Sequence, residues 1–169
     1  MVRIGLLSDT HGWLDPQLTD VFADCDELWH AGDLGNLAVA DTLLSTGKPL
    51  LAVYGNIDDL SIRQRYPLDL IFEREGIRVL MTHIGGYPGR YTARLKKLLD
   101  EHRPHLYVCG HSHILKVVPD QGRQLLHINP GACGREGFHR VRTAVRFTLA
   151  AGKISALEVV ELGARASIE

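Results

Sequence analysis

The chain has 169 residues, a hydrophobic content of 45% and a formal net charge of −1. This length suits one domain, and the balance of apolar and charged residues is typical of a folded globular protein. The near-neutral charge disfavours a strongly basic nucleic-acid-binding protein, so no long nucleic acid is expected as a partner. No stretch approaches the roughly 18 consecutive apolar residues of a membrane span, so no membrane association is expected.

The cysteines and the N-terminal segment predict a cytoplasmic location. Cys25, Cys109 and Cys133 are odd in number and show no Cys-x-x-Cys spacing, which favours reduced thiols over a disulfide framework. The first residues, MVRIGLLSDTHG, lack the longer apolar core and the cleavage site of a signal peptide.

The first two thirds of the chain alternate predicted strands with predicted helices. Short apolar runs predict buried strands, and amphipathic segments with Pro near the start or Gly at the end predict helices. In chain order these are a strand over 3–8, a helix over 15–25, a strand over 27–32, a helix over 36–47, a strand over 49–55, a hairpin over 69–75 and 77–83, a helix over 90–103 and a strand over 106–110.

The last third is mostly strand. The strand-like runs are 114–120, 123–129, 142–150 and 154–162. Glycine-containing turns join the first pair and the second pair. Strands alternating with helices, followed by strands alone, predict an α/β domain with a mixed sheet or two packed sheets.

Polar side chains follow five of the predicted strands, at the point where each strand ends. Binding sites in open α/β sheets form outside the carboxyl ends of strands, so these side chains are candidates for one common site. They are Asp9 and His11, then Asp33, then Asn56 and Asp58, then His83, and finally His111 and His113.

This set mixes carboxylate, amide and imidazole donors without a thiolate. Such donors suit Mn²⁺, Fe²⁺, Zn²⁺, Ni²⁺ or Co²⁺, and they suit Ca²⁺ or Mg²⁺ less well. Taken singly, an Asp after a strand is more often a turn or helix-capping residue, and a lone His is more often hydrogen-bonded than a ligand. With two of the three carboxylates counted, the set offers seven candidate ligands, which suit two ions that share one carboxylate. Two ions about 3.5–4 Å apart can hold both the attacking and the leaving oxygen of a phosphoryl transfer.

The ordered motifs resemble those of the calcineurin-like metallophosphoesterases. The matching pieces are SDTHG (8–12), HAGDLGN (30–36), YGNIDD (54–59), MTHIGG (81–86), CGHSHI (109–114) and INPGA (128–132). The short chain and INPGA make the sequence similar to the small YfcE-like phosphodiesterases of this superfamily. The resemblance implies a single metallophosphoesterase domain over residues 1–169, folded as an α/β four-layer α/β/β/α sandwich with two mixed β-sheets.

The resemblance also implies the site and the reaction. Two divalent ions are expected, Mn²⁺ first, with Ni²⁺, Fe²⁺, Zn²⁺, Co²⁺ or Mg²⁺ as alternatives. The first ion would be held by Asp9, His11 and His113, the second by Asn56, His83 and His111, and Asp33 would bridge them. A hydroxide that bridges the ions would hydrolyse a small phosphodiester of nucleotide or aryl type. The residues expected to act in catalysis are Asp33, Asn56 and Asp58.

Two features depart from the pattern or stay open. Many larger members of the superfamily carry a histidine, credited with helping the leaving group, where this chain has Ile57. Asp58 could replace that histidine or orient a ligand histidine, and the second role is favoured. Arg135, His139 and Arg140 could contact a substrate phosphate. Solvated side chains are the favoured interpretation for these three.

Other functions remain open at this stage. A phosphomonoesterase of the same fold is one alternative. A non-catalytic metal-binding scaffold is another, because a eukaryotic retromer subunit shares this fold and works as an interaction platform. The intact set of seven ligands disfavours the scaffold. Exposed edge strands in the C-terminal half could also pair in a homodimer or a higher homo-oligomer.

Overall fold

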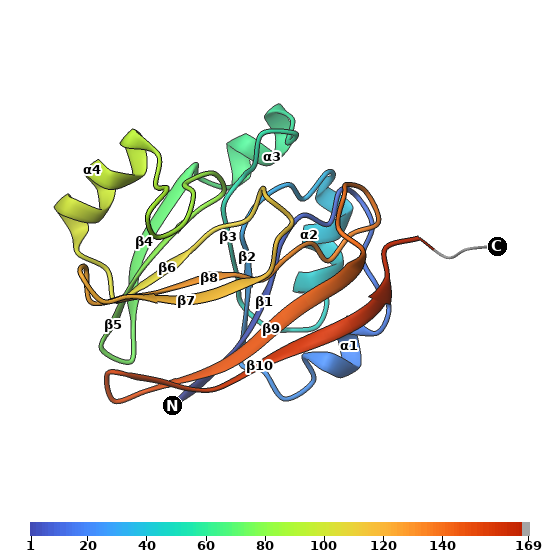
Figure 1. Cartoon of the computed structure of the whole chain (residues 1–169). Coiled ribbons are helices and arrows are strands. Elements are labelled where there is room, and N and C mark those ends of the chain that lie inside the picture. The colour runs from blue at the N-terminus through green and yellow to red at the C-terminus, as the bar shows by residue number, and fades with distance from the viewer. Residues whose placement is uncertain (167–169) are drawn as a thin grey trace.

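Ten strands form two five-stranded sheets in the computed structural model, which describes residues 1–166 (Figure 1). The first sheet has the order β10-β9-β1-β2-β3, and the second has the order β4-β5-β6-β8-β7. The first sheet consists of β1 (Val2–Leu7), β2 (Glu27–His30), β3 (Leu50–Ala52), β9 (Val141–Ala150) and β10 (Lys153–Ala164). The second consists of β4 (Asp69–Arg74), β5 (Ile77–Thr82), β6 (Leu106–Val108), β7 (Lys116–Asp120) and β8 (Leu125–Asn129).

Both sheets are mixed. Strands β1, β2 and β3 run parallel, whereas β9 pairs antiparallel with both β1 and β10. In the second sheet β5, β6 and β8 run parallel, and β4 and β7 are antiparallel edge strands. The parallel strands of each sheet therefore deliver their carboxyl ends, and the residues that follow, at one edge.

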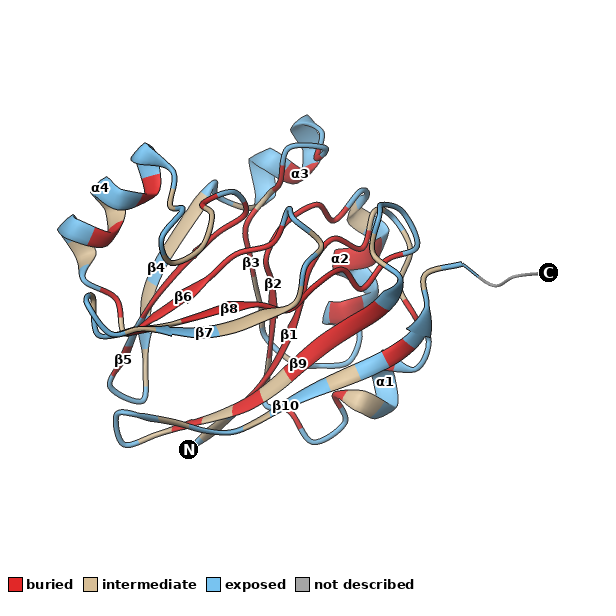
Figure 2. Ribbon diagram, in the orientation of Figure 1, coloured by how far each residue is buried: buried red, intermediate tan, exposed pale blue. Residues whose placement is uncertain are grey.

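The main core lies between the two sheets. Side chains alternate across a strand, so Ile4 and Leu6 of β1 face inward while Leu7 faces a helix. The inward residues of the first sheet meet Val79 and Met81 of β5 in one buried cluster. Figure 2 shows that the central strands of both sheets are buried along most of their length.

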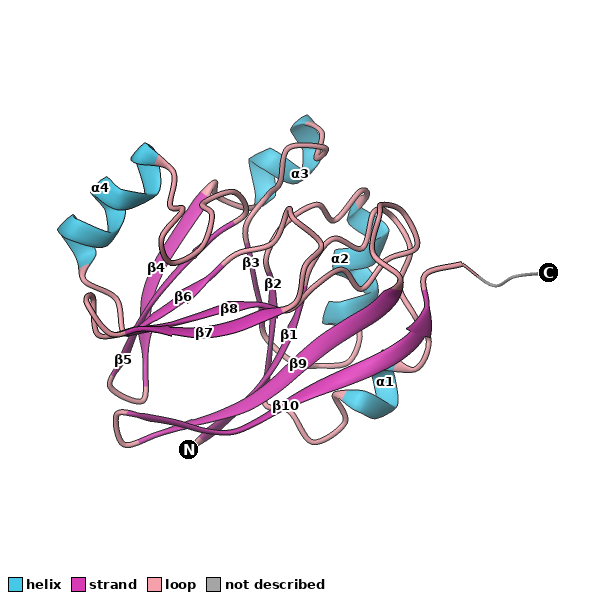
Figure 3. Ribbon diagram, viewed as in Figure 1, coloured by secondary structure: helices cyan, strands magenta, loops and turns pink. Residues whose placement is uncertain are grey.

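Helices cover the outer faces of the sheets. Helices α1 (Leu18–Val21) and α2 (Leu37–Leu44) pack on the first sheet, and α4 (Ala93–His102) packs on the second through Leu95 and Leu99 (Figure 3). The order helix, sheet, sheet, helix confirms the predicted four-layer sandwich. The short helix α3 (Leu60–Arg65) follows β3. No helix in residues 1–166 is both long and apolar enough to cross a bilayer.

Two local predictions differ from the structure. The helix predicted over 15–25 is reduced to α1, because the hydrogen bonds on either side of it close tighter i→i−3 turns, as from Leu18 N to the Asp15 carbonyl oxygen at 3.1 Å and from Ala23 N to that of Asp20 at 3.2 Å. Helix α3 was not predicted, because its six residues carry too little apolar periodicity. The single domain predicted over 1–169 stays a prediction, and its residues 167–169 lie outside the described part.

Candidate metal centre

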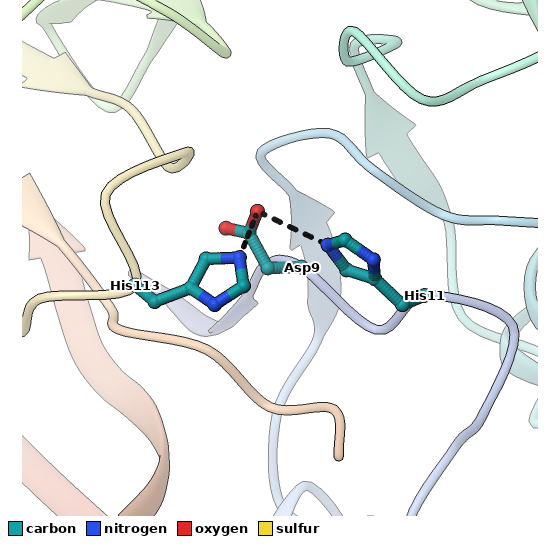
Figure 4. Close-up of side chains that lie close together, drawn as sticks. All are labelled: Asp9, His11 and His113. Atoms are coloured by element: carbon teal, nitrogen blue, oxygen red, sulfur yellow. Dashed lines mark ion pairs between the residues drawn. The ribbon is translucent and has the colours of Figure 1, made fainter. Parts of the chain in front are cut away.

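The side chains at the strand ends gather in two clusters. The first cluster is Asp9, His11 and His113, and the second cluster is Asp33, His83 and His111. Within each cluster the candidate ligand atoms lie within 4.8 Å of one another. Figure 4 shows the imidazoles of His11 and His113 on either side of the Asp9 carboxylate.

Asp33 connects the two clusters, and Asn56 joins the second one. Asp33 Oδ2 lies 3.4 Å from His11 Nε2 of the first cluster and 3.1 Å from His83 Nε2 of the second. Asn56 Oδ1 lies 3.1 Å from His83 Nε2 and 3.0 Å from His111 Nδ1. The structure thus brings together all seven residues that were predicted as ligands.

Two polar atoms at the centre of this group have no hydrogen-bond partner among the described residues. Asp9 Oδ1 is buried and makes no hydrogen bond, although His113 Nε2 lies only 3.1 Å from it in an ion pair. His11 Nε2 is also buried and makes no hydrogen bond, with Asp33 Oδ2 at 3.4 Å. Buried polar atoms are rarely left without a partner, and an oxygen and two ring nitrogens aimed at one point are the donor atoms of a cation site. The residues therefore fit a divalent ion.

The pKa shifts of the site residues also indicate a centre that binds a cation. Burial acts to raise the pKa of Asp9, but the imidazoles of His11 and His113 outweigh it and hold that pKa well below its usual range. The pKa of Asp33 is lowered in the same manner. The carboxylate of Asp33, and then that of Asp9, raises the pKa of His11 to about 10. The site thus stabilises positive charge at its centre, and a divalent ion would replace the proton on His11.

The backbone at these residues is unusual. Five of the seven have a positive φ: Asp9 at 54°, His11 at 48°, Asp33 at 57°, His111 at 71° and His113 at 60°. Asp and His adopt the left-handed region more readily than most residues, but each still costs free energy there. Such conformations cluster at functional sites, and here they turn side chains from separate strand ends toward one point.

Two ligand candidates have their tautomers set by neighbours. His83 Nδ1 lies 2.7 Å from the carbonyl oxygen of Ala31. Because a carbonyl only accepts, Nδ1 carries the hydrogen and Nε2 keeps its lone pair for the site.

His139 sets the tautomer of His113. His139 Nε2 donates to the Gly134 carbonyl at 2.9 Å, so its Nδ1 is free to accept from His113 Nδ1 at 3.2 Å. The His113 Nε2 lone pair then faces Asp9. The favoured interpretation of His139 as a solvated side chain is therefore wrong. Sequence spacing could not reveal this contact, because residues 134–139 must fold back over His113 to make it.

The Asp58 carboxylate is buried and accepts hydrogen bonds from backbone N–H groups rather than from a histidine. Its carboxylate accepts hydrogen bonds from Gly35 N and Gly55 N, both at 2.8 Å, and from Leu34 N at 3.2 Å. It thereby joins the loop after β2 to the loop after β3, which carry Asp33 and Asn56. Among the described residues its carboxylate makes no hydrogen bond to an imidazole.

Of the other residues singled out in the sequence, Ile57 contacts a candidate ligand, whereas Arg135 and Arg140 are exposed. The Ile57 side chain is 44% exposed, and its backbone N–H donates to Asp33 Oδ1 at 3.1 Å. The Arg135 guanidinium lies 4.2 Å from the centre of the Trp13 ring and is exposed, as is Arg140.

The chain matches one family profile, which is described as the calcineurin-like phosphoesterase superfamily domain and covers residues 2–152. No curated protein matches the sequence significantly.

Solved structures share the fold along nearly the whole chain. A conserved protein from Streptococcus pneumoniae, described as a predicted phosphoesterase, is 21% identical with a TM-score of 0.68, over 96% of this chain and 89% of that one. An archaeal phosphodiesterase is 20% identical with a TM-score of 0.71, over 95% and 99%. Vps29 from Entamoeba histolytica, complexed with Zn²⁺, is 17% identical with a TM-score of 0.67, over 94% and 98%.

Proposed function

The chain belongs to the calcineurin-like phosphoesterase superfamily, and from this premise we propose that it is a metal-dependent phosphodiesterase that hydrolyses small phosphodiesters. The observation that carries the proposal is that two buried atoms, Asp9 Oδ1 and His11 Nε2, make no hydrogen bond among the described residues although they lie in a group of seven candidate ligands. The likeness to an archaeal phosphodiesterase favours a diester over a monoester substrate.

The proposed assignment follows the two clusters. Asp9, His11 and His113 would hold one ion. His83, His111 and Asn56 would hold the other, and Asp33 would bridge both, in keeping with its position between His11 and His83. Divalent ions at such a centre lower the pKa of bound water and neutralise charge that develops on the phosphoryl oxygens. The oxygen and nitrogen donors suit Mn²⁺, our first choice, as well as Ni²⁺, Fe²⁺, Zn²⁺ or Co²⁺.

The surrounding residues hold the ligands in place. Asp9 Oδ2 accepts hydrogen bonds from Ser8 Oγ at 2.6 Å and from His111 N at 3.1 Å, which leaves Oδ1 for the ion. Ile57 N fixes Asp33 Oδ1 in the same way. Asp58, assigned to catalysis from the sequence, would contribute by fixing the loops that carry Asp33 and Asn56.

Hydrolysis of two chromogenic esters tests the proposal. Bis-para-nitrophenyl phosphate and para-nitrophenyl phosphate would be offered with EDTA, Mn²⁺, Ni²⁺, Mg²⁺ and Zn²⁺ in turn. Cleavage of the diester that EDTA abolishes and a metal restores, faster than cleavage of the monoester, supports a phosphodiesterase. A preference for the monoester would make the protein a phosphomonoesterase instead.

A metal-binding scaffold is the second candidate. One Vps29 neighbour is described as complexed with Zn²⁺, and another is described as Vacuolar Protein Sorting 29, so metal binding on this fold does not by itself require catalysis. A folded, metal-loaded protein that cleaves neither ester with any of these ions would favour the scaffold.

Location and assembly are part of the proposal. All three cysteines are free and buried, in keeping with the reduced thiols of a cytoplasmic protein. Strands β7 and β10 lie at sheet edges, where a second copy could pair. Sedimentation of the purified protein would establish whether a homodimer forms.

A further inference from the structure

A cleft of about 440 Å³ opens beside the second cluster. Asn56 and His83 form part of its wall, so it begins at the candidate metal centre. We call it the arginine cleft, because Arg63 of α3 and Arg94 of α4 also line it. A group attached to a phosphate at the second cluster could extend into this space.

Part of the arginine cleft is apolar. Tyr54, Leu68 and Ile84 line it, and Leu68 and Ile84 are 42% and 41% exposed. Neighbouring apolar side chains that remain open to water next to a polar centre are typical of a surface that a ligand covers. The organic part of an ester would remove this surface from water.

The two arginines differ in their partners. Arg94 is paired with the carboxylate of Asp69. Arg63 has no carboxylate partner among residues 1–166: its Nε donates to the backbone oxygen of Asp58 at 2.7 Å, and its guanidinium lies 4.8 Å from the centre of the Tyr54 ring. Arg63 is thus a positioned cation with donors left for an anion.

We propose that the arginine cleft binds the organic group of the substrate, and that this group is aromatic or apolar and carries a second anion that pairs with Arg63. The inference rests on the proposed function and narrows its substrate class. A nucleotide ester with an additional phosphate has this chemistry: its base or sugar would lie against Leu68 and Ile84, and its second phosphate would reach Arg63.

Ligand binding tests the inference without any need for turnover. Thymidine 3′,5′-bisphosphate and thymidine 5′-monophosphate would be titrated by calorimetry into the Mn²⁺-loaded protein. We expect the bisphosphate to bind about tenfold more tightly, the factor that one charge-assisted hydrogen bond supplies at a partly exposed site. Arg63→Met should abolish this difference. Arg65→Met is the matched control, because Arg65 lies on the same helix and is also exposed but does not line the cleft.

A second pair of variants tests the apolar wall. Ile84→Ser should weaken both ligands by a similar factor, whereas Ile71→Ser, at a β4 position that is 42% exposed and outside the cleft, should change neither. Equal affinity of the two ligands for the wild type, or a bisphosphate preference that survives Arg63→Met, would overturn the inference. Failure to cleave bis-para-nitrophenyl phosphate in the same samples would overturn the proposed function instead, since the binding ratio is read separately.

Discussion

The two clusters of the candidate metal centre have different surroundings. The first cluster is enclosed: the loop of residues 134–139 passes so close that a Cβ at Gly137 would lie 2.2 Å from His113 Nδ1. Asp9 is fully buried, and the side chains of His11 and His113 are only 14% and 12% exposed. The second cluster opens outward, since His111 is exposed and His83 borders the arginine cleft.

This difference separates two tasks within one site. In the enclosed cluster the Gly134 carbonyl orients His139, and His139 in turn holds the ligand candidate His113. The open cluster has space, apolar surface and a cation for the organic part of a substrate. We therefore expect changes near the first cluster to affect metal binding and changes near the second to affect substrates. The variants below test that division.

The largest effect is expected where the clusters meet. Asp33→Asn removes the negative charge that lies between His11 and His83, while an amide oxygen can still accept from Ile57 N. Activity should fall by about 10³-fold, the upper end of the cost of losing one electrostatic group. Calorimetric titration with Mn²⁺ should show both sites weakened. A wild-type thermal midpoint would serve as the control, and retained activity would contradict the bridging role.

The second-largest effect is expected at Ile57, on the side of the open second cluster. Ile57 follows the ligand candidate Asn56 and has a partly exposed side chain. Ile57→His would supply a proton donor, and general acids contribute about 10²–10⁴-fold. Turnover of monoesters with poor leaving groups should rise by up to about 10²-fold, while para-nitrophenyl esters should gain little. Unchanged rates for both kinds of ester would mean that this position is remote from the leaving oxygen.

A smaller effect should be confined to the enclosed side. His139→Ala leaves His113 Nδ1 without its partner, and loss of such a contact weakens metal binding by about 10–100-fold. One of the two Mn²⁺ sites should weaken in calorimetry while the other is unchanged. His139→Gln should restore part of the affinity, because its side-chain oxygen can accept from the same nitrogen.

Phe138→Ala is the control for His139, because this neighbouring side chain lies fully in solvent. If His139→Ala weakens both sites equally, the division between the clusters fails. If it weakens neither, His139 does not position His113.

The seven ligand candidates could be predicted from the sequence because each lies within five residues of the end of a strand. A buried apolar run fixes the end of its strand, so Asp9 after β1 and His83 after β5 were placed by local pattern alone. His139 and Arg63 could not be predicted in this way. The first acts through the course of a loop, and the second through a six-residue helix. One local signal for that helix was available, since Asp59 precedes it and its side chain accepts from Ile62 N at 3.2 Å, as an N-cap does.

The smallest expected effect contrasts the arginines on the two sides of the site. Arg135 is exposed and stacks on Trp13 near the first cluster, whereas Arg63 lines the arginine cleft beside the second. Arg135→Ala should change KM for bis-para-nitrophenyl phosphate by less than about twofold, because a solvated guanidinium that already contacts an aromatic ring gains little from a further anion. Steady-state kinetics over a range of substrate concentrations would measure it. A large rise in KM for Arg135→Ala, together with wild-type KM for Ile84→Ser in the apolar wall of the arginine cleft, would place the substrate over the enclosed cluster and reverse the division of tasks between the two.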